Sequence, residues 1–315
     1  MGSWRQYARG RVFGQPAGRN LRAGAADCAP NWREGVTGAA GEPPRQHVFA
    51  RRAILGPGCA ALAAVWRAAA LGAVQGLTEF LPVSSSGHLV LAERVLGVAR
   101  PGLALEAGLH LGTLAAVVFA YRRDLWRGAA AWWPQLLVAT APAAAAGLAL
   151  GPLLERLFGS VPAVGAALAA TGVLLLASGR LRPGRRRIGD LRLGEAFRVG
   201  LLQALALAPG LSRSGATIVG GLLLGLEPAE AARFSFLLSL PAVGGAVALH
   251  ARGLRAGAGA GTIWLGAAVA ALVGCWAIGA CVARLRRGGL GPFGWYCLVV
   301  GTLCVLRGAV SGEWR

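Results

Sequence analysis

Two polar segments interrupt an otherwise apolar chain, and the same residue types recur in both at one constant offset. The first runs from Gln75 to Leu91 and the second from Gln203 to Val219. The matching residues are Gln75 with Gln203, Leu77 with Leu205, Ser84 with Ser212, Ser86 with Ser214, and Gly87 with Gly215. The first segment adds Glu79 and His88, and the second adds Arg213 and Thr217. Ionisable side chains are costly inside a membrane, so their presence there indicates a functional site.

The first segment has the pattern of a helix that stops and restarts. Gln75 and Glu79 are four residues apart, so they share one face of a helix. Pro82 then ends this helix, because proline lacks an N–H and clashes with the preceding turn. The serines that follow can cap a new helix. His88 would lie in its first turn, on the same side as Ser85.

The second segment repeats this plan with different functional groups. Pro209-Gly210 breaks the helix, and Ser212 or Ser214 can cap the next one. Arg213 lies at the new start, with Thr217 one turn further along. For any single serine or threonine, bonding within or between helices is the commoner role in membranes.

Together the two helix starts favour an anionic ligand. Helix N-termini present free N–H groups and a partial positive charge, which bind phosphate. Arg213 adds a planar charged fork that matches phosphate oxygens. Glu79 does not suit a phosphate directly, which suggests a divalent cation bridging to phosphate, or a proton acceptor. Glu106 and His110 are also four apart in an apolar run, and whether they support this site or only the fold stays open.

The elements that position these groups are membrane helices. The chain is 55% hydrophobic and only 14% charged, with a mean hydropathy of +0.56. Apolar runs of about 20 residues recur, which is the length that crosses a bilayer. We therefore predict an all-α polytopic integral membrane protein with inverted repeats, about six full transmembrane helices and two re-entrant helical hairpins.

The net charge of +19 does not indicate a nucleic-acid partner. Every basic residue is arginine, and the arginines cluster between apolar runs, as in cytoplasmic loops of membrane proteins. Residues 1–52 are rich in Arg, Gly and Pro, and we expect a disordered extension there. Residues 53–315 are expected to form one membrane domain of two repeats, about 53–180 and 195–310, with a binding site between them.

At these residues the chain resembles the undecaprenyl-diphosphate phosphatase family, the bacitracin-resistance membrane proteins. One family signature reads here as Gln75-Gly-Leu-Thr-Glu79 followed by Pro82-Val-Ser-Ser-Ser-Gly-His88. The other reads as Pro209-Gly-Leu-Ser-Arg-Ser-Gly-Ala-Thr217. Gln75 stands where many members have Glu, which weakens any mechanism that needs two carboxylates. The match covers about residues 62 to 310, and the N-terminal extension is not part of the pattern.

The resemblance implies hydrolysis of undecaprenyl diphosphate to undecaprenyl phosphate and inorganic phosphate, which recycles the lipid carrier for cell-wall synthesis and confers bacitracin resistance. It also implies a bacterial plasma-membrane location, an active site open to the extracytoplasmic side, and dependence on Mg²⁺ or Ca²⁺. The expected partners are the substrate and the lipid bilayer. The oligomeric state is open, with a homodimer as one option.

We hypothesise attack on the terminal phosphorus, with lipid phosphate as the leaving group. The residues expected to hold phosphate oxygens are Ser84, Ser212, Arg213, Ser214 and Thr217, with Arg213 also stabilising the transition state. Glu79, with Gln75, would hold the cation. Ser85 and His88 form the expected nucleophile and base, while direct attack by His88 or by water stays open. A polyprenyl-phosphate flippase would need the same phosphate clamp and is the alternative function.

Overall fold

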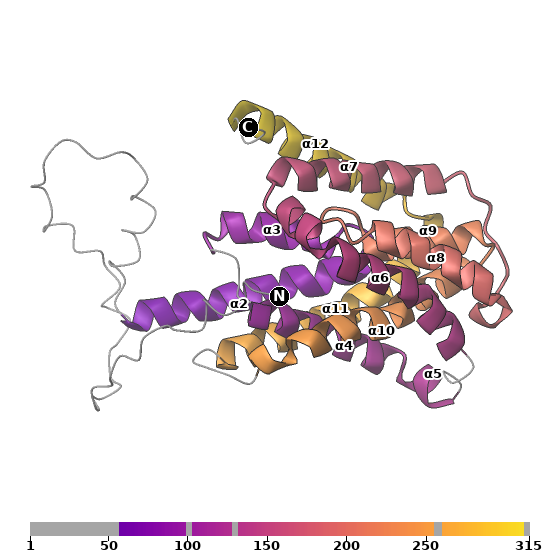
Figure 1. Ribbon diagram of the computed structural model, residues 1–315, viewed down its shortest axis with the longest axis horizontal. Helices are drawn as coiled ribbons and strands as arrows, with labels where there is room; N and C mark the ends of the chain where they lie inside the picture. Colours follow the sequence, from indigo (N-terminus) through magenta and orange to yellow (C-terminus); the bar gives the residue numbers. More distant parts are fainter. Residues whose placement is uncertain (1–56, 99–102, 128–131, 255–259, 312–315) are drawn as a thin grey trace, which may run out of the picture. The chain divides into compact units, whose positions relative to one another are not determined.

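The computed structural model describes residues 57–98, 103–127, 132–254 and 260–311, and the structural statements below concern these residues. Residues 64–315 form one compact unit. The predicted N-terminal extension, residues 1–52, lies outside the described residues. The described residues form helices and no β-strand, which confirms the all-α prediction (Figure 1).

The helices follow one another with short connections. They are α2 (Pro57–Phe80), α3 (Ser85–Val95), α4 (Leu103–Ala120), α5 (Arg122–Arg127), α6 (Trp133–Phe158), α7 (Val161–Ser178), the 3₁₀ turn η4 (Ile188–Asp190), α8 (Leu193–Leu205), α9 (Arg213–Leu223), α10 (Pro228–Leu254), α11 (Ala260–Gly288) and α12 (Gly291–Ser311). Within the described ranges, 6 helices are long and apolar enough to cross a membrane, namely α2, α6, α7, α10, α11 and α12. Helix α4 is a shorter apolar helix. The polytopic membrane architecture is therefore the one predicted.

Two helical hairpins carry the polar segments. Helix α2 stops at Phe80 and α3 restarts at Ser85, while α8 stops at Leu205 and α9 restarts at Arg213. The breaks thus fall at the predicted prolines. Helices α3, α8 and α9 have 11, 13 and 11 residues, too few to span a bilayer core of about 30 Å. Both arms of the α8–α9 hairpin are therefore too short to cross, whereas in the α2–α3 hairpin only the α3 arm is too short.

The tips of the two hairpins meet inside the bundle. A methyl group added at Gly87 of α3 would lie 3.2 Å from Cα of Gly210 in the α8–α9 turn. Gly210 has a φ of 99°, and its own Cβ would lie 2.3 Å from the carbonyl oxygen of Val164 in α7. Thr171 of α7 also donates a hydrogen bond to the Gly210 carbonyl (3.0 Å) and accepts one from the Ser212 amide (3.0 Å). Glycine is required at this turn, because any side chain would be both strained and blocked.

Corresponding helices make corresponding contacts in the two halves of the chain. By their order along the chain, α4 corresponds to α10, α6 to α11 and α7 to α12. Helix α4 packs on α11, and its counterpart α10 packs on α6. The counterparts α4 and α10 also pack on each other, as do α7 and α12. Helix α8 packs on α6, and α2 packs on α11, where a Cβ at Gly72 would lie 2.4 Å from the Gly266 carbonyl oxygen. Such close backbone approaches are typical of membrane helices that associate through small residues. The proposed boundaries of the two repeats stay a prediction.

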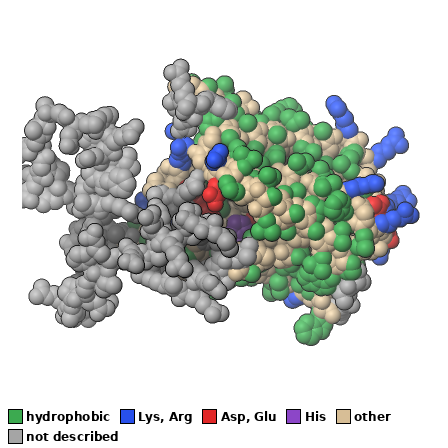
Figure 2. All heavy atoms as spheres, in the orientation of Figure 1, with side chains coloured by type: hydrophobic (Ala, Val, Ile, Leu, Met, Phe, Trp, Pro, Cys, Tyr) green, Lys and Arg blue, Asp and Glu red, His purple; other side chains and the backbone are tan. Residues whose placement is uncertain are grey.

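One end of the described unit is strongly basic. Figure 2 shows blue arginine side chains gathered at the right of the view. Arg233 of α10 pairs with Asp124 of α5 (2.6 Å), and its guanidinium carbon lies 4.5 Å from the ring centre of Trp132. Arg186 donates to both carboxylate oxygens of Glu195, at 2.9 and 2.8 Å. Hydrogen bonding from Arg186 lowers the pKa of Glu195 to about 2.

Candidate functional site

A cavity of about 690 Å³ lies beside the hairpin tips. Its polar part is lined by Glu79, Ser84, Ser85, Ser86, Glu106, His110 and Arg213. Its remaining wall is mostly apolar and comes from α6, the turn between α8 and α9, and α10, for example Leu148, Leu207 and Val247. One cavity thus combines a charged end with an apolar wall, which suits a ligand with a charged head and an apolar tail.

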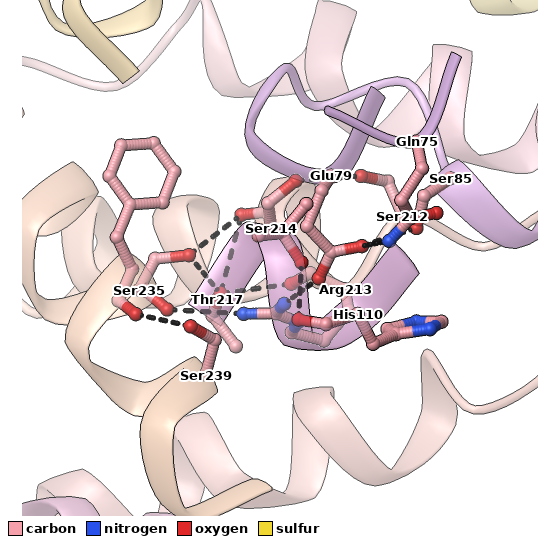
Figure 3. Close-up of polar contacts among 12 residues, drawn as sticks. Gln75, Glu79, Ser85, His110, Ser212, Arg213, Ser214, Thr217, Ser235 and Ser239 are labelled. Atoms are coloured by element: carbon pink, nitrogen blue, oxygen red, sulfur yellow. Dashed lines mark hydrogen bonds and ion pairs between the residues drawn. The ribbon is translucent and has the colours of Figure 1, made fainter. Parts of the chain in front are cut away.

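Glu79 is the centre of the polar end (Figure 3). Arg213 donates to one of its carboxylate oxygens, and Ser85 Oγ donates to the other at 2.7 Å. Gln75 Nε2 donates to that second oxygen at 3.0 Å, as expected for residues four apart on one helix. These bonds hold a buried carboxylate between a cation and a hydroxyl, so its charge is compensated without water.

Ser85 and Arg213 occupy equivalent places in the two hairpins. Each is the first residue of its helix, α3 or α9. Ser84 and Ser212 are the N-caps, and each side-chain oxygen accepts the amide N–H three residues later, at 3.3 and 3.0 Å. The identical Ser-x-Ser-Gly sequence therefore builds the same helix start twice. The residue that differs between the copies bonds to Glu79 in both cases.

The two caps differ in backbone strain. Ser84 has a φ of 69°, in the left-handed region that side chains disfavour, whereas Ser212 has an ordinary φ of −79°. Within the described residues, Ser84 is the non-glycine residue with positive φ. Strain of this kind costs on the order of 1–3 kcal/mol and collects at functional sites. It occurs here in the copy that carries Glu79.

Arg213 is held from both sides. Its second nitrogen donates to the backbone carbonyl of Ser235 on α10 at 3.3 Å. Thr217 Oγ1 lies 2.6 Å from Ser235 Oγ and donates to the Arg213 carbonyl at 2.9 Å. These contacts fix both the helix start and the guanidinium, which leaves the fork at the cavity wall in one orientation.

Three of the hydroxyls predicted to bind phosphate are placed elsewhere. Ser212, Ser214 and Thr217 are buried, and none of them lines the cavity formed by the described residues. Ser212 and Ser214 bond to each other at 3.2 Å, and Ser214 Oγ donates to the Leu81 carbonyl in the other hairpin at 3.3 Å. Of the three, Ser214 joins the two hairpins, Ser212 caps α9, and Thr217 bonds to Ser235 of α10. Ser84, Arg213 and the catalytic candidates Glu79 and Ser85 do line the cavity.

The structure does not pair Ser85 with His88. His88 Nδ1 bonds to the Ser84 carbonyl oxygen at 2.8 Å, and Nε2 bonds to Tyr296 Oη at 2.8 Å. The imidazole also stacks on the Tyr296 ring, with ring centres 5.6 Å apart. Both ring nitrogens are therefore occupied away from Ser85. The spacing of one helical turn predicts only local partners, and Tyr296 lies 208 residues further along the chain.

Two residues matter more here than the sequence indicated. Ser235 anchors Arg213 from outside the two polar segments, and a serine inside an apolar run is a sequence signal of the same kind as theirs. His110 lines the cavity, where the sequence left its role open. Deciding its role required knowing how α4 packs beside the hairpins.

Comparison with known proteins identifies the family. Residues 68–303 match the model of the family described as Bacitracin resistance protein BacA. The chain belongs to this family. A relative from Desulfosudis oleivorans, named undecaprenyl-diphosphatase, is 41% identical over 258 residues, which cover 73% of this chain and 94% of the relative. Relatives of the same name are 42% identical in Rubrobacter xylanophilus (260 residues, 75% and 96%) and 36% identical in Desulforapulum autotrophicum (274 residues, 78% and 99%).

Family and helix lengths agree that the chain is a multi-pass membrane protein. The cavity therefore lies within helices that lipid surrounds. Backbone that is not helical, such as the hairpin turns, is tolerated at such depth only inside protein or beside water. The turns meet this condition, because they lie against α7 and at the cavity.

Proposed function

We propose that this protein hydrolyses undecaprenyl diphosphate to undecaprenyl phosphate and inorganic phosphate, which recycles the lipid carrier of cell-wall synthesis and confers bacitracin resistance. The observation that carries the proposal is the Ser85–Glu79–Arg213 arrangement at the charged end of a largely apolar cavity. The diphosphate would lie at that end, and the prenyl chain would lie along the apolar wall. The names of the family relatives agree with this substrate.

Ser85 is the proposed nucleophile, with Glu79 rather than His88 as its proton acceptor. The 2.7 Å hydrogen bond from Ser85 Oγ directs the hydroxyl proton towards a carboxylate oxygen of Glu79 before any reaction begins. When a diphosphate arrives, Arg213 can exchange Glu79 for phosphate oxygens. This exchange leaves Glu79 available as base and brings positive charge to the transferring phosphoryl group, where charge builds in the transition state.

The residues present suit a divalent cation that the substrate shares. Glu79 is a carboxylate ligand, and Gln75 Oε1 is a buried oxygen with no hydrogen-bond partner among the described residues. No cluster of three or more His, Cys, Asp or Glu that could hold a metal occurs in the described ranges. Mg²⁺ needs no such cluster, because it often binds through one or two carboxylates together with substrate phosphates and water. Bound Mg²⁺ or Ca²⁺ would neutralise diphosphate charge, with Glu79 and Gln75 as its protein ligands.

The basic end of the protein supports an extracytoplasmic active site in the bacterial plasma membrane. The Arg233–Asp124 pair ties the start of α10 to α5, and Tyr121 shares a groove with Arg286 at the end of α11. Positive loops face the cytoplasm. Glu106 precedes Tyr121 by about four helical turns, or roughly 22 Å. The cavity lies at Glu106 and so towards the opposite face.

Phosphate release from undecaprenyl diphosphate by purified protein in detergent tests the proposal. We expect release by the wild type with Mg²⁺ or Ca²⁺, and a loss of about 10²-fold or more in Ser85→Ala. Thr140→Val is a matched control, because Thr140 lines the same cavity but donates to the Leu136 carbonyl of its own helix (2.7 Å). No release by folded wild type would refute the function. Wild-type rates in Ser85→Ala would refute the nucleophile, and a flippase would release none.

A further inference from the structure

His110 places an imidazole in the reaction cavity. It lies on α4, two turns into the helix, and shares the cavity wall with Glu79, Ser85 and Arg213 (Figure 3). Its side chain is half-buried, and the helix around it is held by close packing of α4 on α11. A Cβ at Gly112 would lie 2.1 Å from the Ala267 carbonyl oxygen. The imidazole is therefore carried on a firmly seated helix.

One nitrogen of the His110 ring has a hydrogen-bond partner among the described residues, and the other has none. Nδ1 lies 2.9 Å from the Glu106 carbonyl oxygen, which can only accept a hydrogen bond. Nδ1 must therefore carry a proton, and in the neutral ring Nε2 has the free lone pair. The hydrogen bond found for the ring among the described residues is this one at Nδ1, and none is found at Nε2. The ring is thus oriented by its backbone bond and keeps one nitrogen for a ligand.

The charged groups around this ring are those of the site itself. Glu79 of α2 and Arg213 of α9 line the same cavity, and Glu106 lies on His110's own helix. The walls from α6, α8 and α10 add no charged side chain to the cavity lining. A diphosphate in the cavity would bring further negative charge to the wall that His110 shares.

His88 is a useful contrast. Both of its ring nitrogens have partners, in Ser84 and Tyr296, and it does not line the cavity. Among the imidazoles whose side chains are described, His110 is the one that lines the cavity and has a ring nitrogen without a hydrogen-bond partner.

Building on the proposed function, we propose that His110 is a further catalytic residue, the general acid that protonates the leaving lipid phosphate. As Ser85 Oγ bonds to the terminal phosphorus, its proton passes to Glu79. The bond from phosphorus to the bridging oxygen breaks, and that oxygen keeps the electron pair and takes the Nε2 proton of His110. Water then attacks the phosphoserine and gives a proton to Nε2. Ser85 Oγ leaves and recovers its proton from Glu79, so both groups return to their starting state.

The pH dependence of kcat/KM in the His110→Gln variant tests this role. This ratio reports steps through the first phosphoryl transfer, in which His110 must be protonated. The wild-type rate should fall as rising pH deprotonates the ring, and this alkaline fall should disappear in the variant. General acids contribute about 10²–10⁴-fold, so we expect kcat/KM to drop by at least about 10²-fold near the optimum, mostly in kcat. Thr140→Val should keep the wild-type profile.

Chemical rescue separates catalysis from folding. His110→Ala should keep a thermal midpoint near that of the wild type, and added imidazole should restore part of its rate. Retention of the alkaline fall in His110→Gln would overturn the assignment, as would activity loss without rescue by imidazole. If His88→Gln, and not His110→Gln, abolishes the alkaline fall, His88 is the acid. Absence of phosphate release in the wild type would instead refute the proposed function, so the two failures are distinguishable.

Discussion

The Glu79–Arg213 ion pair should dominate the stability of the hairpin tips, and a double-mutant cycle can measure this. Glu79 is 6% exposed and Arg213 is 17% exposed, so removing either partner leaves a charge with little access to water. Losing one partner of a buried pair costs about 3–5 kcal/mol. We expect Glu79→Gln and Arg213→Gln each to approach this range, with Arg213→Gln the worse because Glu79 is the more buried.

The double variant should cost less than the sum of the single variants. Once both charges are gone, no uncompensated charge remains, and residues in contact couple by about 0.5–3 kcal/mol. The less buried pair Arg186–Glu195 is the control, with 35% and 21% exposure, and its coupling should stay within about 1 kcal/mol. Reversible unfolding in mixed detergent micelles supplies the four free energies. Additivity at Glu79 and Arg213 within about 0.5 kcal/mol would show that the pair is not coupled.

Three further changes test the packing, the caps and the basic end. Gly172→Ala should cost about 1–3 kcal/mol, because its Cβ would lie 2.6 Å from a backbone nitrogen of α12, whereas Gly279→Ala meets nothing within 4 Å and should be neutral or stabilising in thermal unfolding. Ser84→Gly should lower the thermal midpoint less than Ser212→Gly, because glycine relieves the positive φ only at residue 84; equal losses would contradict this. Glu195 has its pKa lowered from 4.5 to about 2, so the stability it adds is complete above 4.5 and lost as pH falls towards 2. The midpoint of Glu195→Gln should therefore fall less on acidification over that range than the wild-type midpoint.

The sequence predicted local geometry well, because proline breaks, caps and four-residue spacings depend on neighbouring residues. The Gln75–Glu79 bond and the restart of a helix after Ser84 are examples. It predicted long-range partners poorly. Helical spacing and the need of a serine nucleophile for a base predict a Ser85–His88 pair, but His88 bonds to Tyr296 on α12. Likewise, Ser235 reaches Arg213 only because α10 packs on α9.

The equivalence of the two hairpins explains how one carboxylate, Glu79, can contact both the proposed nucleophile and the arginine proposed to bind phosphate. Ser85 and Arg213 begin equivalent helices with the same cap, and each bonds to a different oxygen of Glu79. A duplicated helix start would by itself give two equal anion sites. Substituting a hydroxyl at one start and a guanidinium at the other converts this symmetry into a nucleophile facing a cation. Glu79 lies between them and keeps both in place until a phosphate competes for Arg213. In the proposed mechanism, an arriving diphosphate releases Glu79 from Arg213, and Glu79 then acts as the base for Ser85.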